Sequence, residues 1–361
     1  MSKTMHGSAD DSTTFTLAMQ AHVAGDLEQA AALYRQAGED GDPDGWFQLG
    51  SLLSDLGRDD EAFDAYQQAG EGGVAEGLLN AANMLADHYD RPEAALELYQ
   101  RGLASGDPRA MTELGVVLER LGREDEAETQ FRQAIAGGDL RAHLRLGNLL
   151  ERADDLDGAE AEYRQALDAS ISGSWSDLAI LREDAGAHDE AEALLRAGVA
   201  ADDPWSYANL GRLLCEQGQN EQAEAVFKEA MDRGHTLGLL NYGNCLSEWE
   251  GREEEAEAVY RQAIAGGDEE GHLNLGTLLR DLGRSEEAEA EYRTAIELGD
   301  DMARLAYGEF LLKAGRGDEA TEQLEHAWAS GYEDDVDEIL AGAGAGSDAE
   351  ASPDVDADPA A

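Results

Sequence analysis

Alanine and aromatic residues recur along the chain at a fixed spacing. Successive alanines of this pattern lie 32 or 33 residues apart. Residues four apart share one face of an α-helix, and a period of this length is typical of repeat proteins. The pattern therefore predicts ten units of one helical repeat. The pairs are Ala30/Tyr34, Ala62/Tyr66, Ala95/Tyr99, Ala127/Phe131, Ala159/Tyr163, Ala191/Leu195, Ala223/Phe227, Ala256/Tyr260, Ala288/Tyr292 and Ala320/Leu324.

A second set of small residues lies upstream of the alanines with the same period. Between the two sets stand segments such as "LGRDDEA", whose glycine suits a helix C-terminus and whose acidic residues suit the start of the next helix. Each unit is therefore predicted to contain two antiparallel helices, A and B, whose backbones approach closely at the small residues. Because one pair cannot bury its apolar stripe alone, the units must stack. The small residues are Gly50, Ala82, Gly115, Gly147, Ala179, Gly211, Gly243, Gly276 and Gly308.

The order W-x-x-L-G-x-x-L in helix A, followed by A-x-x-x-Y/F-x-x-A in helix B, resembles the tetratricopeptide repeat. The junction "AGGDLRAHLRLG", residues 136–147, is similar to that of the related Sel-like repeats. The resemblance implies an all-α fold, a right-handed superhelical solenoid of about ten helix-turn-helix repeats. It also implies a non-enzymatic role in protein–protein interaction. The order W-x-x-L-G-x-x-L, then A-x-x-x-Y/F-x-x-A, carries the resemblance, for example at Trp46, Leu49, Gly50, Leu53, Ala62, Tyr66 and Ala69.

Four segments are predicted along the chain. After the last repeat, "YEDDVDEILA" places Val336, Ile339 and Leu340 on one helical face, which predicts a short cap. The residues that follow are mostly Ala, Gly, Asp, Ser and Pro and cannot bury apolar area. The predicted segments are a disordered N-terminus (1–13), the repeat array (14–333), a capping helix (334–342) and a disordered acidic tail (343–361).

The charge of the chain is strongly negative. It has 79 Asp and Glu against 26 Lys and Arg, a net charge of −53. Such a charge opposes compaction by self-repulsion unless salt screens it. The pattern resembles that of proteins from salt-accumulating halophiles and predicts a halophilic archaeal source, with an acidic mesophilic protein as the alternative. The same field repels phosphate backbones and anionic membranes, so we expect neither as a partner.

The sequence offers little for catalysis, metal binding or membrane insertion. No window approaches the ~18 apolar residues of a membrane span, which predicts a cytoplasmic protein. Cys215 and Cys245 are expected to be reduced helix residues there. The histidines lack the spacing of metal ligands, and no nucleophile stands in a catalytic pattern. We therefore expect no cofactor, no metal and no enzymatic activity.

Asparagines of helix A are confined to two positions. With the small residue counted as position 8, they take positions 6 and 9, on one face with positions 2 and 13. In tetratricopeptide arrays this face lines the concave groove. The row resembles the asparagine ladder of O-linked N-acetylglucosamine transferase arrays, where amides hold a peptide backbone; the alternative is ordinary solvated polar residues. The predicted groove asparagines are Asn80, Asn83, Asn148, Asn209, Asn241, Asn244 and Asn274.

Arginines cluster on the same face in two neighbouring units. Arg141 and Arg145 resemble half of the carboxylate clamp of heat-shock co-chaperones, although Glu113 stands where that clamp has an asparagine. Because arginine favours carboxylates, the predicted guest carries an acidic segment or a C-terminal carboxylate. The alternative is a surface network with Glu119 and Glu151. The predicted groove arginines are Arg109, Arg120, Arg141, Arg145, Arg152 and Arg212.

The function predicted from these patterns is that of a non-enzymatic adaptor. Its partner would be a protein or peptide whose extended segment lies along the inner face of the array. A regulatory or scaffold subunit of a larger enzyme or signalling complex is the first alternative. An acidic mimic of nucleic acid is a weaker one.

Overall fold

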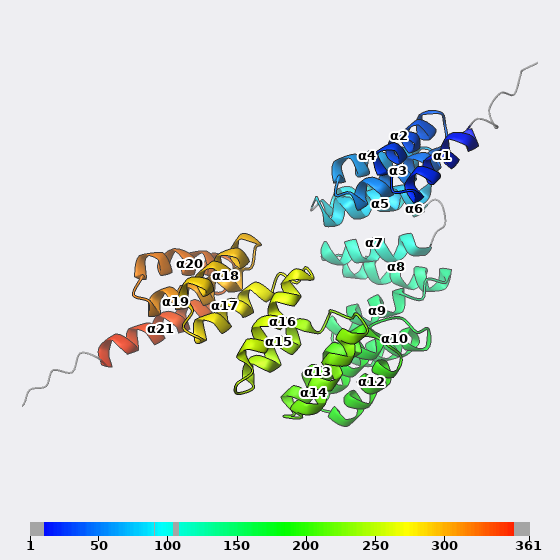
Figure 1. Ribbon diagram of the computed structural model, residues 1–361. Helices are drawn as coiled ribbons and strands as arrows, with labels where there is room; N and C mark the ends of the chain where they lie inside the picture. The colour runs from blue at the N-terminus through cyan, green and yellow to red at the C-terminus, as the bar shows by residue number, and fades with distance from the viewer. Residues whose placement is uncertain (1–10, 90, 104–107, 350–361) are drawn as a thin grey trace, which may run out of the picture. The chain divides into compact units, whose positions relative to one another are not determined.

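The computed structural model describes residues 11–89, 91–103 and 108–349, and these form 21 α-helices and no strand (Figure 1). The chain divides into two units at Ser174. The first unit contains α1 (Asp11–Val23), α2 (Leu27–Glu39), α3 (Pro43–Asp55), α4 (Asp59–Glu71), α5 (Ala75–Asp87), α6 (Pro92–Leu103), α7 (Pro108–Arg120), α8 (Glu124–Gly137), α9 (Ala142–Arg152) and α10 (Leu156–Asp168).

The second unit continues the series. Its helices are α11 (Ser174–Asp184), α12 (His188–Ala200), α13 (Pro204–Glu216), α14 (Asn220–Asp232), α15 (Leu239–Glu248), α16 (Glu253–Ala265), α17 (Gly271–Asp281), α18 (Ser285–Glu297), α19 (Asp301–Lys313), α20 (Gly317–Ala329) and α21 (Glu333–Ala349).

Odd-numbered helices up to α19 are the A helices, and even-numbered helices are the B helices. In the first unit α3 packs against α4 and α4 against α5; in the second unit α17, α18 and α19 pack in the same order. The A-to-B turns contain glycines with positive φ, such as Gly57 and Gly122 at 68°, a conformation that favours glycine. The prediction of an all-α helical-repeat fold is confirmed.

The small residues of the A helices allow the close approach of the two helices in each repeat. A Cβ atom built on Gly50 would lie 2.6 Å from the ring of Tyr66, and one on Gly147 would lie 2.5 Å from the ring of Tyr163. The periodic alanines of the B helices are all completely buried. Where position 8 is glycine and helix B carries an aromatic residue, the repeat is therefore held by the ring packed directly on the backbone of helix A.

The last helix, α21, closes the second unit. Val336 is 3% exposed and packs with Leu324 and Ala327, while Leu340 is exposed. The helix runs to Ala349, past the predicted end at residue 342. Several alanines in this stretch favour helix, and the interleaved glycines, each costing about 1 kcal/mol, do not end it. Residues 1–10 and 350–361, in the two segments predicted to be disordered, lie outside the described residues.

Arginines at the A-to-B turns tie consecutive repeats together. Arg252 pairs with Glu255 in its own repeat and with Glu224 of the preceding B helix, at 3.0 Å from the Glu224 carboxylate. Hydrogen bonds from Arg252 and Lys228 lower the pKa of Glu224 to about 2. The same double pairing recurs at Arg284, with Glu257 and Glu287, and at Arg316, with Glu289 and Glu319.

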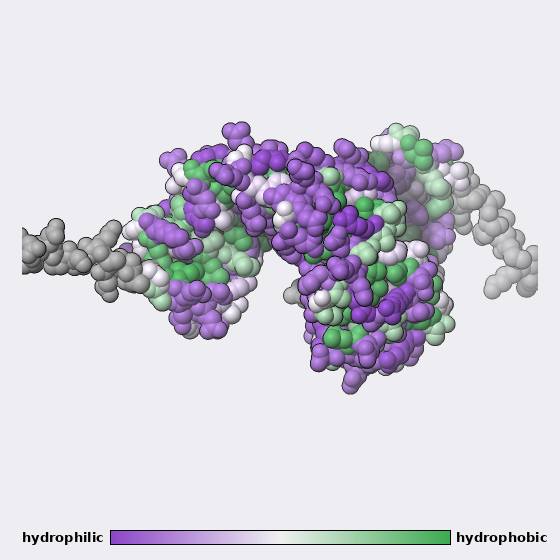
Figure 2. All heavy atoms as spheres, turned by 90° about the horizontal axis from the view of Figure 1, so that it is seen from below, coloured by the Kyte–Doolittle hydropathy of each residue, from purple (hydrophilic) through white to green (hydrophobic). Residues whose placement is uncertain are grey.

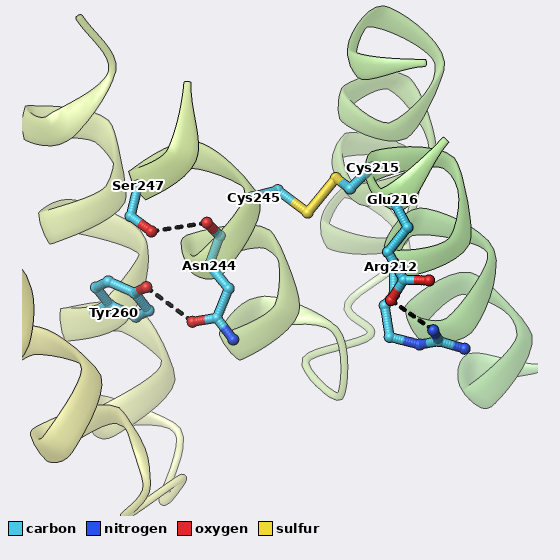
Figure 3. The surroundings of a disulfide bond; sticks show 7 residues. All are labelled: Arg212, Cys215, Glu216, Asn244, Cys245, Ser247 and Tyr260. Carbon is cyan, nitrogen blue, oxygen red and sulfur yellow. Dashed lines mark hydrogen bonds and ion pairs between the residues drawn. A yellow bond between two sulfur atoms is a disulfide. The ribbon is translucent and has the colours of Figure 1, made fainter. Parts of the chain in front are cut away.

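Cys215 and Cys245 form a disulfide between α13 and α15, with their Cα atoms 6.1 Å apart (Figure 3). The prediction that both cysteines are reduced is wrong. It treated each cysteine as an isolated helix residue. The repeat places consecutive A helices side by side, so two cysteines 30 residues apart meet across them.

Candidate functional site

The predicted groove residues lie on A helices, or, for Arg141, at the residue before α9. None of these side chains is buried; each is half-buried or exposed. Hydrophilic residues also cover most of the face of the molecule seen in Figure 2. The contacts of the groove residues separate them into two kinds.

Position 9 of helix A holds the tyrosine hydroxyl of helix B in the same repeat. In each case the hydroxyl donates to the amide oxygen of the asparagine. The tyrosine rings are nearly completely buried, and a buried hydroxyl needs a polar partner. These asparagines therefore have a structural role. The pairs are Tyr99/Asn83, Tyr163/Asn148 (2.7 Å) and Tyr260/Asn244 (2.8 Å).

The identity of position 9 follows the aromatic residue opposite it. In the repeat that has Phe131 instead of tyrosine, position 9 is Val116, and in the repeat that has Phe227 it is Arg212. Phenylalanine has no hydroxyl and requires no acceptor. This coupling is visible in the sequence, yet the sequence analysis grouped positions 6 and 9 together and missed it.

Position 6 has no common partner in the second unit. Asn274 donates to the amide oxygen of Asn244 in the preceding repeat, at 3.1 Å. Asn209 donates to the Ser176 hydroxyl of the preceding repeat and to the carbonyl oxygen of Trp205, the latter at 3.2 Å. Within the described chain, Asn241 has no hydrogen-bond partner for its half-buried side chain. Its amide is thus available to a guest.

Two position-6 residues of the first unit show the same contrast. Asn80 forms a side-chain hydrogen bond with Tyr66 of the preceding repeat. Arg145 is exposed and has no hydrogen-bond or ion-pair partner in the part of the chain that the structure describes. The guanidinium of Arg145 is therefore available to an external carboxylate.

A cleft of about 600 Å³ opens beside α15 and α17 in the second unit. Its lining combines hydrogen-bonding groups with carboxylates and the edge of Tyr260. A cleft of this size accommodates a few residues of an extended chain. The polar residues that line it include Asn244, Ser247, Glu248, Asn274, Thr277 and Asp281.

Of the two arginines that resemble half of a carboxylate clamp, Arg141 is engaged within the chain. Arg141 donates from Nε and Nη2 to the carboxylate of Asp139, at 2.9 and 2.8 Å. Asp139 is 9% exposed and also accepts from the Thr112 hydroxyl, at 2.8 Å. Arg141 therefore compensates a buried charge at the junction between α8 and α9.

The remaining groove arginines have partners within the chain. The sequence offered a surface network with Glu119 and Glu151 as the alternative. Glu119 does pair with Arg152, whereas Glu151 accepts a hydrogen bond from the Tyr163 hydroxyl. Among the predicted groove arginines, Arg145 alone lacks a partner in the described residues. The others pair as Arg109/Glu76 (3.8 Å), Arg120/Ala86 carbonyl (3.1 Å), Arg152/Glu119, and Arg212 with Glu183 (3.0 Å) and Glu216 (2.7 Å).

The contribution of Asp139 to stability is expected to disappear in acid. Hydrogen bonds from Arg141, together with one from Thr112, hold the pKa of Asp139 below its ordinary value despite burial. A lowered folded-state pKa gives stability that is complete above the unfolded pKa of about 4 and is lost as pH falls through the folded pKa. Asp139→Asn should therefore lower the unfolding free energy by about 1–3 kcal/mol at pH 7.

The measurement is urea unfolding of both proteins between pH 7 and 3, where the difference should be constant down to pH 5 and shrink below pH 4. Asp268→Asn is the matched control. Asp268 lies at the same junction of another repeat, and its side chain has no partner among the described residues. Curves that stay parallel down to pH 3 would contradict the role of Asp139.

Comparison with known proteins identifies the family. A profile of the tetratricopeptide repeat matches residues 15–73, 90–139, 125–174 and 273–335, more than half of the chain. A second tetratricopeptide repeat profile matches residues 205–237. The chain belongs to the tetratricopeptide repeat family.

Solved structures resemble this chain at low identity. A tetratricopeptide repeat protein from Parabacteroides merdae is 17% identical, covers 70% of this chain and 98% of its own, and has a TM-score of 0.49. PilW, a type IV pilus biogenesis factor, is 19% identical, covers 54% of this chain and 96% of its own, and has a TM-score of 0.45. MamA from Desulfovibrio magneticus RS-1 is 17% identical, covers 45% of this chain and 95% of its own, and has a TM-score of 0.38. No curated protein sequence matched.

Tetratricopeptide repeat proteins typically mediate protein–protein interactions, and their fold is typically a non-enzymatic scaffold. Among the described residues, no group of His, Cys, Asp and Glu side chains is arranged to hold a metal ion. No helix in that part of the chain has the length and hydrophobicity needed to cross a membrane.

Proposed function

We propose that this protein is a non-enzymatic adaptor that binds an extended segment of a partner protein along position 6 of its A helices. The observation that carries the proposal is the contrast between positions 9 and 6. Position-9 asparagines hold tyrosines of their own repeats, whereas Asn241 and Arg145 at position 6 have no partner in the described chain. An amide offers donors and an acceptor to any peptide unit.

Each unit offers its own chemistry to such a guest. In the first unit the guanidinium of Arg145, which has no partner among the described residues, favours an acidic side chain or a C-terminal carboxylate. In the second unit the cleft that contains Asn244 and Asn274 also contains Glu248 and Asp281, so it favours a neutral or cationic stretch. A regulatory or scaffold subunit of a larger complex would use the same surfaces.

The carboxylates of the B helices support a mimic of nucleic acid less well than they would if they were unpaired. Glu224, Glu257 and Glu289 each pair with an arginine. A mimic of nucleic acid needs unpaired carboxylates, because these must contact the cationic side chains of a protein that normally binds nucleic acid. The unpaired groups at position 6 therefore favour the adaptor.

The charge supports the proposal that the protein works in a salt-accumulating archaeon. Three of its 26 cations are lysine, and the net charge is −53. We propose a cytoplasmic location on the same ground, because such cells screen this charge in the cytosol. The disulfide is the feature to reconcile with that location, since disulfides are rare in reducing compartments.

The test is affinity selection of a pool of random nonapeptides, half with a free C-terminal carboxylate and half amidated, at several salt concentrations. Asn241→Ala should weaken binding of the retained peptides about two- to tenfold, because one hydrogen bond is lost. Arg145→Ala should abolish the preference for acidic and carboxylate-terminated peptides and flatten the salt dependence. Neither variant should change the melting temperature.

Matched controls are Asn220→Ala and Arg101→Ala, which remove an amide and a guanidinium from exposed positions of B helices. Both should bind like the wild type. If the position-6 variants bind normally and the controls do not, the partner surface lies on helix B and the proposed groove is wrong.

A further inference from the structure

Helix α15, which carries Asn241 and Asn244, is the shortest helix of the described chain. It has 10 residues, whereas the other A helices of the second unit have 11 or 13. No side chain caps its N-terminus at Gly238, and at its C-terminus the backbone of Trp249 is extended. A short helix without caps depends on its neighbours for stability.

The disulfide fixes this short helix to the preceding A helix. Cys245 directly follows Asn244 on α15, and Cys215 follows Arg212 by three residues on α13, so the bond lies between two predicted groove residues (Figure 3). It closes a chain segment of 30 residues that contains α14. Closure of such a loop favours the docked helix by roughly 10²–10³-fold.

The two cysteine residues differ in exposure. Cys245 is 6% exposed, and Cys215 is half-buried. An external thiolate therefore reaches the sulfur of Cys215 first. The half-buried Cys215 is thus the more exposed end of the bond, the end at which exchange with an external thiolate is favoured.

We propose that the Cys215–Cys245 disulfide is a redox latch for the guest-binding surface of α15, closed when oxidised and open when reduced. This inference rests on the proposed function of that surface. The reductant is a dithiol. Its first thiolate attacks Sγ of Cys215, the S–S bond breaks, and Cys245 leaves as a thiolate that takes up a proton. The second thiol of the reductant then displaces Cys215, so two electrons and two protons reduce the protein while the dithiol becomes a disulfide.

Reduction releases α15 without removing any group that binds the guest. The other helices of the second unit keep their own buried side chains, such as Phe227 and Tyr292, so the array stays folded when α15 undocks. Asn241 is then presented by a helix that is docked in a smaller fraction of the molecules. The latch thus changes the affinity of the groove and leaves its chemistry unchanged.

The experiment compares the oxidised full chain with the chain reduced by dithiothreitol, by hydrogen exchange and by binding of the nonapeptide pool. On reduction, exchange of the α15 amides should rise about 10²-fold, while α5, in the unit without cysteines, should not change. Binding of peptides that depend on Asn241 should fall at least fivefold and return on reoxidation. The double variant C215S/C245S should match the reduced protein without reductant; if it fails to fold, the reduced wild type carries the test.

Two outcomes would overturn the latch while leaving the adaptor intact. The oxidised and reduced proteins could bind the pool equally, or α15 could exchange equally in both. If the oxidised protein binds no peptide, the proposed adaptor function is wrong. The regulation of binding by the disulfide is then wrong as well, even if reduction speeds hydrogen exchange of α15.

Discussion

In dilute buffer below about 0.1 M salt, the protein should lose most of its helicity, and molar salt should restore it. The cause is the excess of 79 acidic over 26 basic side chains, most of whose carboxylates have no cation to pair with. The Debye length falls from about 10 Å at 0.1 M salt to 3 Å at 1 M. At 0.1 M salt, acidic side chains of neighbouring repeats therefore still repel one another. At 1 M salt this repulsion is screened.

Salt also weakens the Arg–Glu pairs between repeats. Whether salt stabilises or destabilises the fold therefore depends on which is larger, the screened repulsion or the screened pairing. Arg252, Arg284 and Arg316 each hold two glutamates at hydrogen-bond distance, where pairs are screened less than distant charges. Exposed pairs contribute about 0–1 kcal/mol each, too little to offset a charge of −53. The net effect of salt should therefore be strongly stabilising.

Circular dichroism at 222 nm, with thermal melts in 0.05, 0.5 and 3 M KCl, measures this response. Sucrose at matched osmolarity is the control, because it strengthens apolar burial without screening charge. Recovery of helicity in sucrose alone would show that charge is not the cause. Identical melting curves in dilute and molar KCl would exclude the halophilic source.

The repeat architecture could be predicted from the sequence because its determinants are local and recur ten times. Ala159 and Tyr163 lie one helical turn apart, and Gly147 lies at a constant distance before them. Each copy repeats the same crossing, so the pattern is strong even though each residue is common. The register of helix A on helix B followed directly from it.

Contacts that join different repeats were harder to predict. The Arg252–Glu224 pair and the disulfide both connect residues about one repeat apart, and the sequence does not show which side of each helix meets its neighbour. The Tyr–Asn bonds stay within one repeat and could have been found. Three repeats with a tyrosine have no asparagine at position 9. Tyr66 forms a hydrogen bond with Ser51 and Tyr292 donates to the hydroxyl of Thr277, both at position 9. In the first repeat position 9 is Met19, and the Tyr34 hydroxyl lies 3.4 Å from Nδ1 of His22.

Gly211→Ala should destabilise the second unit by about 2–3 kcal/mol. The added Cβ would lie 2.3 Å from the ring of Phe227, which is 2% exposed and cannot move into solvent. The helices α13 and α14 must then separate, and the packing of Phe227 on the bare helix is lost. Urea unfolding and hydrogen exchange of α13 and α14 measure the effect.

Gly342→Ala is the matched control, because Gly342 lies in α21 and a Cβ there meets nothing within 4 Å. It should stabilise α21 by up to about 1 kcal/mol, since alanine is the better helix former. A second variant separates the clash from a backbone effect. Gly211→Ala with Phe227→Leu should recover part of the loss, because two repeats already have leucine at this position, Leu195 opposite Ala179 and Leu324 opposite Gly308. If Gly211→Ala is as stable as the wild type, the crossing is not tight, and the packing of Phe227 does not require glycine at position 8.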